Sequence, residues 1–282
     1  MKKIISILLL IILISCNEKE ITINLDKHEN KLVVNSLLAP SDSVKVNISK
    51  SISVLENDTV NYIENAEVQF YCQNKLVNTM NYLGSGMYYL NTSITTGNEY
   101  SIIVDVSDFE TITANSVIPG PSQILSVDTI SIDDEYLYCE IELRNDLTSL
   151  NYYLLEVESK YPLLNSDSTL TNQVDIINSE LIIENGDLGE ELERLVFTGE
   201  VLQDSVYALG FILDKETLKS GAHSSNTLYI HFKKISEEYY LYVKSYYASE
   251  SKQDEVYSNV ENGYGIFAGY CLNTDSLVIN NP

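Results

Sequence analysis

The clearest chemical signal in the sequence is a cysteine placed for lipid attachment. Lys2 and Lys3 precede an apolar stretch at residues 4–14, which is followed by the small Ser15 and by Cys16. This is the layout of a lipoprotein signal peptide. The apolar stretch is too short for a membrane-spanning helix, which needs about 20 residues. We therefore expect removal of residues 1–15 and acylation of the Cys16 thiol, so that acyl chains anchor the mature chain. The alternative is an ordinary secretory signal with an incidental cysteine.

Histidines, the usual acid–base catalysts, are sparse. The chain has three histidines, His28, His223 and His231. The first lies in a polar leader, the second in a turn-like segment, and His231 on the polar face of an alternating strand pattern, where we expect it to face solvent. The sequence has neither the G-x-S-x-G of a serine hydrolase nor the H-E-x-x-H of a zinc protease. We predict that the protein is not an enzyme and uses no cofactor.

Acidic residues are abundant enough that neighbouring carboxylates carry little information. Residues 133–135 and 190–193 contain such groups, but the chain has 41 Asp and Glu, so composition alone produces them and a glycosidase is not predicted. Residues 165–168 and 185–187 offer oxygen ligands for calcium, without the spacing of an EF-hand. Calcium binding stays open and no metal ligand is assigned. A pocket with converging titratable groups would favour an enzyme instead.

Three further cysteines do not form a recognisable metal or redox motif. Cys72, Cys139 and Cys271 show no C-x-x-C spacing. Cys72 and Cys139 are in phase with apolar residues of their strand patterns, which predicts that both side chains point inward. We expect core thiols, since buried cysteine packs as a small apolar residue. One disulfide in an oxidising envelope is the alternative.

Composition indicates a folded, strongly acidic protein. The 282 residues carry a formal charge of −24 and are 44% hydrophobic. Removal of residues 1–15 would leave 267 residues and, with the loss of Lys2 and Lys3, a charge of −26. Such a chain is repelled by phosphate backbones, so nucleic-acid binding is excluded. Its apolar content argues against disorder.

Short alternating runs predict a mainly β protein of two domains. Seven runs within residues 31–118 favour an immunoglobulin-like β-sandwich. Pro119, Gly120 and Pro121 interrupt the ladder because proline cannot donate a strand hydrogen bond, and we place a linker at residues 119–123. Residues 16–30 would be a lipidated tether, and residues 124–282 a larger β-rich domain. In that domain we predict strands at 124–132, 135–143, 152–159, 174–184, 193–200, 205–213 and 227–234, with a polar stretch up to about residue 173.

One segment of the second domain has helical rather than strand periodicity. Ser236 suits an N-cap, two glutamates follow it, and tyrosines recur at spacings of three and four. These features predict a helix over residues 237–249. Its tyrosine stripe is most simply a packing face with hydroxyls at a wet edge. A ligand-stacking platform is the alternative.

Several segments resemble a widespread family of Bacteroidota lipoproteins known only as a domain of unknown function. The most specific is Tyr257-Ser-Asn-Val-Glu-Asn-Gly-Tyr-Gly-Ile-Phe267, preceded by the helical segment at 236–247. Residues 16–21, 31–35, 66–68 and 113–114 add to the likeness. Members of this family are often encoded beside TonB-dependent outer-membrane receptors. The resemblance implies a lipoprotein of the outer membrane, accessory to nutrient uptake, and implies no reaction.

Within the most specific segment, Asn262, Gly263 and Gly265 predict a tight turn before a final strand. The alternative is contact of a ligand or partner with Tyr264 and Phe267. Taken together, the sequence predicts a non-catalytic envelope lipoprotein, a binding or accessory component of a TonB-dependent uptake system. It would be held to the outer membrane through Cys16, on a face that stays open. The alternative is a structural or adhesion protein.

Overall fold

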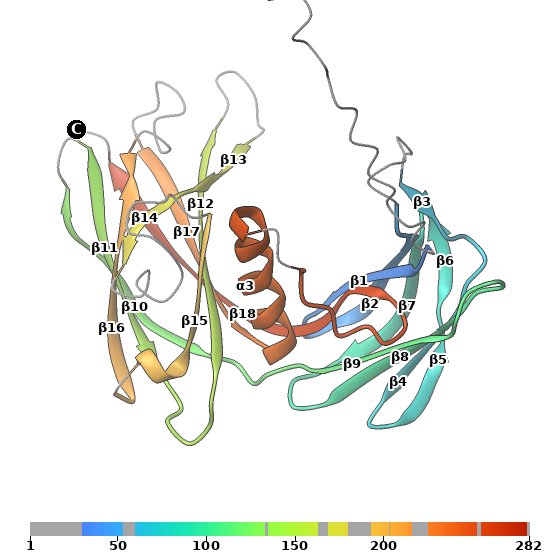
Figure 1. The fold of residues 1–282 in the computed structure, drawn as a ribbon. Helices are drawn as coiled ribbons and strands as arrows, with labels where there is room; N and C mark the ends of the chain where they lie inside the picture. The colour runs from blue at the N-terminus through green and yellow to red at the C-terminus, as the bar shows by residue number, and fades with distance from the viewer. Residues whose placement is uncertain are drawn as a thin grey trace, which may run out of the picture.

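The computed structural model describes residues 30–52, 60–132, 135–162, 169–179, 193–202, 204–215, 225–252 and 255–280. Within these residues the chain is mainly β, with three sheets and one α-helix (Figure 1). This confirms the predicted mainly β class and the helix in the second half. Cys16, the signal peptide and nearly all of the predicted tether lie outside the described residues. So do His28, His223 and both candidate calcium segments.

The first half of the chain contributes nine strands to two sheets. Strands β1, β2, β7, β6 and β3 belong to a large ten-stranded sheet, and a second sheet has the order β5-β4-β8-β9. Apolar residues alternate along these strands, and those of β1, β2 and β7 share one core with those of β4, β8 and β9. The bounds are β1 Leu32–Leu38, β2 Ser41–Lys50, β3 Asn61–Tyr62, β4 Glu67–Cys72, β5 Lys75–Thr79, β6 Asn81–Gly84, β7 Met87–Ile94, β8 Glu99–Asp105 and β9 Ile112–Val117.

The second half extends the large sheet and adds a third sheet of order β10-β11-β16-β14. Strands β13, β12, β17, β18 and β15 join the large sheet, and their inward residues share a core with β11 and β16. The bounds are β10 Gln123–Ile132, β11 Tyr136–Arg144, β12 Tyr152–Pro162, β13 Thr169–Val174, β14 Ile176–Ser179, β15 Arg194–Thr198, the 3-10 turn η2 Gly199–Val201, β16 Val206–Asp214, β17 Ser225–Ile235, the helix α3 Glu237–Lys252 and β18 Tyr264–Asn280.

The long strand β18 connects the two halves of the large sheet. Its first part pairs in parallel with β1, from Val33 opposite Tyr264 to Leu38 opposite Gly269. Its second part pairs antiparallel with β17, from Ile235 opposite Tyr270 to Ser225 opposite Asn280. The division at residues 119–123 stays a prediction. The last strand, β18, pairs with one strand from each side of that division, β1 before it and β17 after it.

The turn before β18 is where backbone conformation requires glycine. Asn262 has a φ of 60° and Gly265 a φ of 104°, which is a region that residues with a Cβ rarely adopt. A Cβ on Gly265 would lie 2.0 Å from the backbone oxygen of Val34. The chain therefore turns at Asn262 and enters β18 in close contact with β1, as the predicted turn before a final strand requires.

The cysteines within the described residues are free thiols. Cys139 is buried among apolar residues of the third sheet, Cys271 is buried, and Cys72 is partly exposed. Burial raises the pKa of the Cys139 thiol to about 12. Cys139 is therefore a core thiol, as expected, and its protonated form is a poor nucleophile. Cys72 is only partly buried and packs against the core shared by β4 and β8.

Candidate ligand-binding site

Helix α3 is fixed at its first turn by polar contacts with two strands. The Ser236 hydroxyl accepts a hydrogen bond from the backbone N–H of Tyr239 at 3.4 Å, which is the predicted N-cap. The backbone N–H of Gly269 in β18 lies 3.3 Å from the same hydroxyl and 3.1 Å from the hydroxyl of Ser116 in β9. Ser116 in turn donates to the Glu238 carboxylate at 3.0 Å. The start of α3 is thereby held against both β18 and β9.

The body of α3 packs on the face of the large sheet that points away from the β11 and β16 core (Figure 1). Tyr239, Tyr240 and Val243 are buried. They pack against apolar side chains of four strands, namely Leu154, Val196, Ile235, Ile266 and Ala268. The predicted packing face of the tyrosine stripe is therefore present, because the spacing of three and four places these side chains on one side of the helix.

A groove of about 560 Å³ runs beside α3. One wall is the helix, with Tyr239, Tyr242, Val243, Tyr246 and Tyr247. The strands contribute Leu37, Ile266 and Arg194, and Glu193 lies directly before β15. Tyr246 is 47% exposed, so the tyrosine stripe continues from the buried face into the groove. A volume of this size is within the range of small-molecule sites, about 300–1,000 Å³. The groove combines aromatic walls with one cation and one carboxylate.

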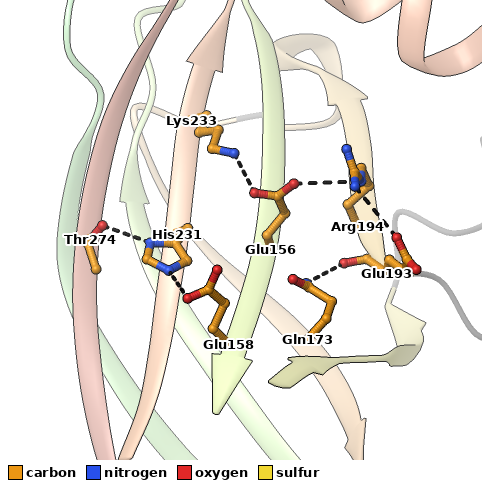
Figure 2. Close-up of polar contacts among 8 residues, drawn as sticks. All are labelled: Glu156, Glu158, Gln173, Glu193, Arg194, His231, Lys233 and Thr274. Carbon is orange, nitrogen blue, oxygen red and sulfur yellow. Dashed lines mark hydrogen bonds and ion pairs between the residues drawn. The ribbon is translucent and has the colours of Figure 1, made fainter. Parts of the chain in front are cut away.

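A cluster of charged side chains lies on the same face of the sheet (Figure 2), and two of its members, Glu193 and Arg194, line the groove. The Glu156 carboxylate of β12 forms an ion pair with the Lys233 ammonium of β17, and both side chains are mostly buried. Arg194 lies 3.6 Å from Glu156 through Nε and 3.6 Å from Glu193 through Nη2. Gln173 of β13 donates to the backbone oxygen of Glu193 at 2.8 Å. The cluster thus fixes the start of β15 and, with it, Arg194.

The ionisation of this region follows from burial and neighbouring charge. Burial alone would lower the pKa of Arg194. The Glu156 carboxylate and other neighbouring groups raise it by more, so the pKa of Arg194 is raised overall. Burial, with a further contribution from Glu156, raises the pKa of Tyr239 to about 12. At neutral pH the groove therefore holds a guanidinium cation beside a protonated phenol.

His231 lies in a second polar row on the same face. Its Nδ1 is 2.9 Å from the hydroxyl of Thr274, and its Nε2 is 3.4 Å from the Glu158 carboxylate. Threonine, histidine and glutamate are residue types used in nucleophilic catalysis. None of the three lines the groove beside α3. In the described part of the chain, no group of three or more His, Cys, Asp or Glu is placed to hold a metal ion.

The two aromatic residues singled out in the sequence occupy different environments. Tyr264 is 38% exposed, and the Lys31 ammonium lies over its ring, 5.4 Å from the centroid. Phe267 has no exposed surface and belongs to the core shared by β1 and β8. Neither residue lines the groove. Sequence reasoning did not identify Glu156, Lys233 or Arg194, which three separate strands bring together.

Comparison with known proteins places the chain in a family. Residues 18–274 match the family described as "Domain of unknown function (DUF4249)". The chain belongs to this family. The groove, the charged cluster and the turn before β18 all lie within the matched residues.

Among solved structures, this DUF4249 member is similar to the crystal structure of a DUF3823 family protein from Parabacteroides merdae. The identity is 12%, over 73% of this chain and 91% of that chain, with a TM-score of 0.22. None of the curated proteins matches the chain. Across the described residues, no helix combines the length and apolar character needed to cross a membrane.

The Glu156–Lys233 pair predicts a measurable cost when its carboxylate is removed. Glu156→Gln leaves the Lys233 ammonium, whose side chain is 16% exposed, without its counter-charge. We expect the free energy of unfolding to fall by about 2 kcal/mol, between the values typical of exposed and of buried pairs. Urea denaturation measures the change. Glu193→Gln is the matched control, because the Glu193 side chain is 65% exposed and its loss should cost less than about 0.5 kcal/mol. Equal effects of the two substitutions would contradict the structural role of Glu156.

Buried tyrosines predict a loss of stability at alkaline pH. Burial raises the pKa of both Tyr153 and Tyr239 to about 12, from about 10 in an unfolded chain. Because the folded-state pKa is the higher one, the stabilisation is complete below pH 10 and is lost as the pH rises through about 12. Urea denaturation across this interval should show a falling free energy of unfolding. Tyr239→Phe should make the decline with pH less steep, whereas Tyr82→Phe, at an exposed position, should not. Identical slopes in the unmodified protein and both variants would show that buried Tyr239 does not cause the decline.

Proposed function

We propose that this DUF4249 member is a lipid-anchored, non-catalytic binding protein of the outer membrane, an accessory component of a TonB-dependent nutrient uptake system. The observation that carries the proposal is the groove beside α3, which offers four tyrosines and one arginine to a small ligand. Aromatic walls with a few placed polar groups are typical of ligand sites. His231, Thr274 and Glu158 of the polar row lie outside this groove, which supports binding rather than catalysis.

Two features of the chain support the envelope location. The lipoprotein signal ends at Ser15, directly before Cys16, and the family match begins at residue 18, so the matched region starts close to the acylation site. The resemblance to lipoproteins encoded beside TonB-dependent receptors supports the same location and partner. On this proposal residues 1–15 are removed, and residues 16–30 tether the folded chain to the membrane.

We further propose that the first half is an immunoglobulin-like β-sandwich that lifts the groove away from the membrane. The support is the core shared by β1, β2 and β7 of the large sheet with β4, β8 and β9 of the second sheet. Two sheets that bury one face each against a common core are the basis of that architecture.

Membrane attachment is tested by replacing the acylated sulfur. Cys16→Ser should move the protein from the membrane fraction to the soluble fraction, because the acyl chains supply the membrane affinity. Cys72→Ser is the matched control, since it removes a thiol from the folded chain and leaves the anchor intact. A Cys16→Ser protein that stays in the membrane fraction would refute the lipid anchor.

The accessory role is tested by crosslinking intact cells that produce the tagged protein, followed by purification from solubilised membranes. We expect a TonB-dependent receptor to be recovered with the protein. Tyr242→Ala combined with Tyr246→Ala should leave recovery of the receptor unchanged. On the transported nutrient, cells with this double variant should grow no better than a deletion strain. Failure to recover a receptor, with normal growth of a deletion strain on every nutrient tested, would refute the accessory role.

A further inference from the structure

Arginine is scarce in this chain, and one of its two arginines lines the groove. The sequence has 17 Lys and Arg, of which only Arg144 and Arg194 are arginines. Arg144 ends β11 and is exposed. Arg194 begins β15, and its side chain is 33% exposed at the groove. The guanidinium is a rigid, planar fork of donors that lysine does not replace.

The donors of Arg194 are incompletely used within the described residues. Its two carboxylate neighbours, Glu156 and Glu193, both lie at 3.6 Å, whereas a charge-assisted hydrogen bond is about 2.7–2.9 Å long. Nε is buried and makes no hydrogen bond in the part of the chain that the structure describes. The guanidinium therefore has charge neighbours but no bidentate partner.

The acidic neighbours leave room for a ligand carboxylate. Glu156 is engaged by the Lys233 ammonium at much closer range than by Arg194. Glu193 is 65% exposed, so solvent screens its interaction with Arg194. Among the described residues that line the groove, Arg194 is the one cation. In a chain with a formal charge of −24, an anion is held only where such a local cation outweighs the general repulsion.

The rest of the groove suits a ring. Tyr239, Tyr242 and Tyr246 present phenol rings with hydroxyl tips, and such side chains pack against a flat apolar face while bonding its polar edge. The hydroxyl of Tyr239 stays protonated, because burial raises its pKa to about 12. It therefore remains a hydrogen-bond donor at neutral pH.

We propose that the groove binds a small molecule that carries one carboxylate on a ring, with the carboxylate paired to the Arg194 guanidinium and the ring against Tyr242 and Tyr246. The inference rests on the proposed binding function and names its ligand class. Two kinds of compound share this chemistry, the sugar acids and the aromatic acids. The test therefore includes one probe of each kind.

The scarcity of arginine makes the test direct. Protein labelled with ¹⁵N-arginine gives two Nε–Hε signals in NMR, one for Arg194 and one for Arg144, and Arg194→Lys assigns them. The lipidated protein in detergent is titrated with galacturonate and with 4-hydroxybenzoate. The neutral controls are galactose and 4-hydroxybenzyl alcohol. We expect one acid to shift the Arg194 signal saturably at millimolar concentration and to leave the Arg144 signal unchanged.

Variants separate the contribution of the bidentate guanidinium geometry from that of the positive charge. Arg194→Lys keeps the charge but loses the bidentate geometry, and we expect its affinity for the acid to fall at least about tenfold. Arg144→Lys is the matched control and should bind as the unmodified protein does.

Each contrary result has its own meaning. A neutral probe that binds as tightly as its acid would overturn the carboxylate anchor and leave the proposed binding function intact. An Arg194 signal unmoved by both acids would overturn the ligand class, whereas failure of receptor capture would refute the accessory role independently.

Discussion

Gly265→Ala is expected to prevent stable folding, because the added methyl group would collide with the neighbouring strand. The Cβ would lie 2.0 Å from the backbone oxygen of Val34 and 2.9 Å from its carbonyl carbon. These are backbone atoms of β1 in the parallel ladder with β18, so the contact is relieved only by separating the strands. We expect the free energy of unfolding to fall by more than about 4 kcal/mol, a large part of the about 5–15 kcal/mol that stabilises a typical domain.

Gly84→Ala is the control that separates the cost of this collision from the cost of backbone strain at a positive φ. Gly84 has a φ of 115°, close to the 104° of Gly265, but no atom lies within 4 Å of its Cβ position. It should cost only about 1–2 kcal/mol, the strain of a side chain in this conformation. Soluble yield and urea denaturation of the two variants provide the measurement. Similar stabilities would show that β1 and β18 do not approach as closely as the structure places them.

Local periodicity was sufficient to predict most elements. The helix expected at residues 237–249 is α3, Glu237–Lys252, and its first turn follows from Ser236 and the glutamates. Its end was placed three residues early because the final residues are polar helix formers that carry no stop signal. The polar stretch expected up to residue 173 was wrong at its end, where Thr169–Val174 forms β13. Val174 joins the core, but the three residues before it, Thr171, Asn172 and Gln173, are polar, so the stretch lacks a clear alternating apolar pattern.

Pairing across the chain was not predictable from local pattern. The turn at Asn262 was expected, but nothing in the residues of β18 indicates a parallel partner at β1 and an antiparallel one at β17. The charged cluster beside the groove has the same origin. The one sequence feature that marks Glu156 is that it interrupts an apolar run in β12. Its partners, Arg194 and Lys233, come from two other strands. Residues that converge through tertiary structure carry no common spacing in the sequence.

Asn259 illustrates how one side chain joins parts of the fold that are distant in sequence. Its Nδ2 donates to the backbone oxygens of Asn115 in β9 and Phe267 in β18, at 3.0 and 2.7 Å. Its Oδ1 accepts from the backbone N–H of Phe267 at 3.0 Å. The side chain thus pairs with β18 as a strand backbone would, and it continues the connection to β9.

Asn259→Asp should be strongly destabilising, because a carboxylate replaces the amide donor opposite two carbonyl oxygens. Of the three hydrogen bonds only that from Phe267 N–H survives, and the other two contacts become repulsive. We expect a loss of about 3 kcal/mol, since unsatisfied and opposed polar groups cost about 1–3 kcal/mol each. Asn259→Ala should lose less, because it removes the bonds without adding a charge. Thermal and urea denaturation report both losses. Asn91→Asp, at an exposed position of β7, should change stability by less than about 0.5 kcal/mol; an Asn259→Asp protein as stable as that control would show that Asn259 does not connect β9 to β18.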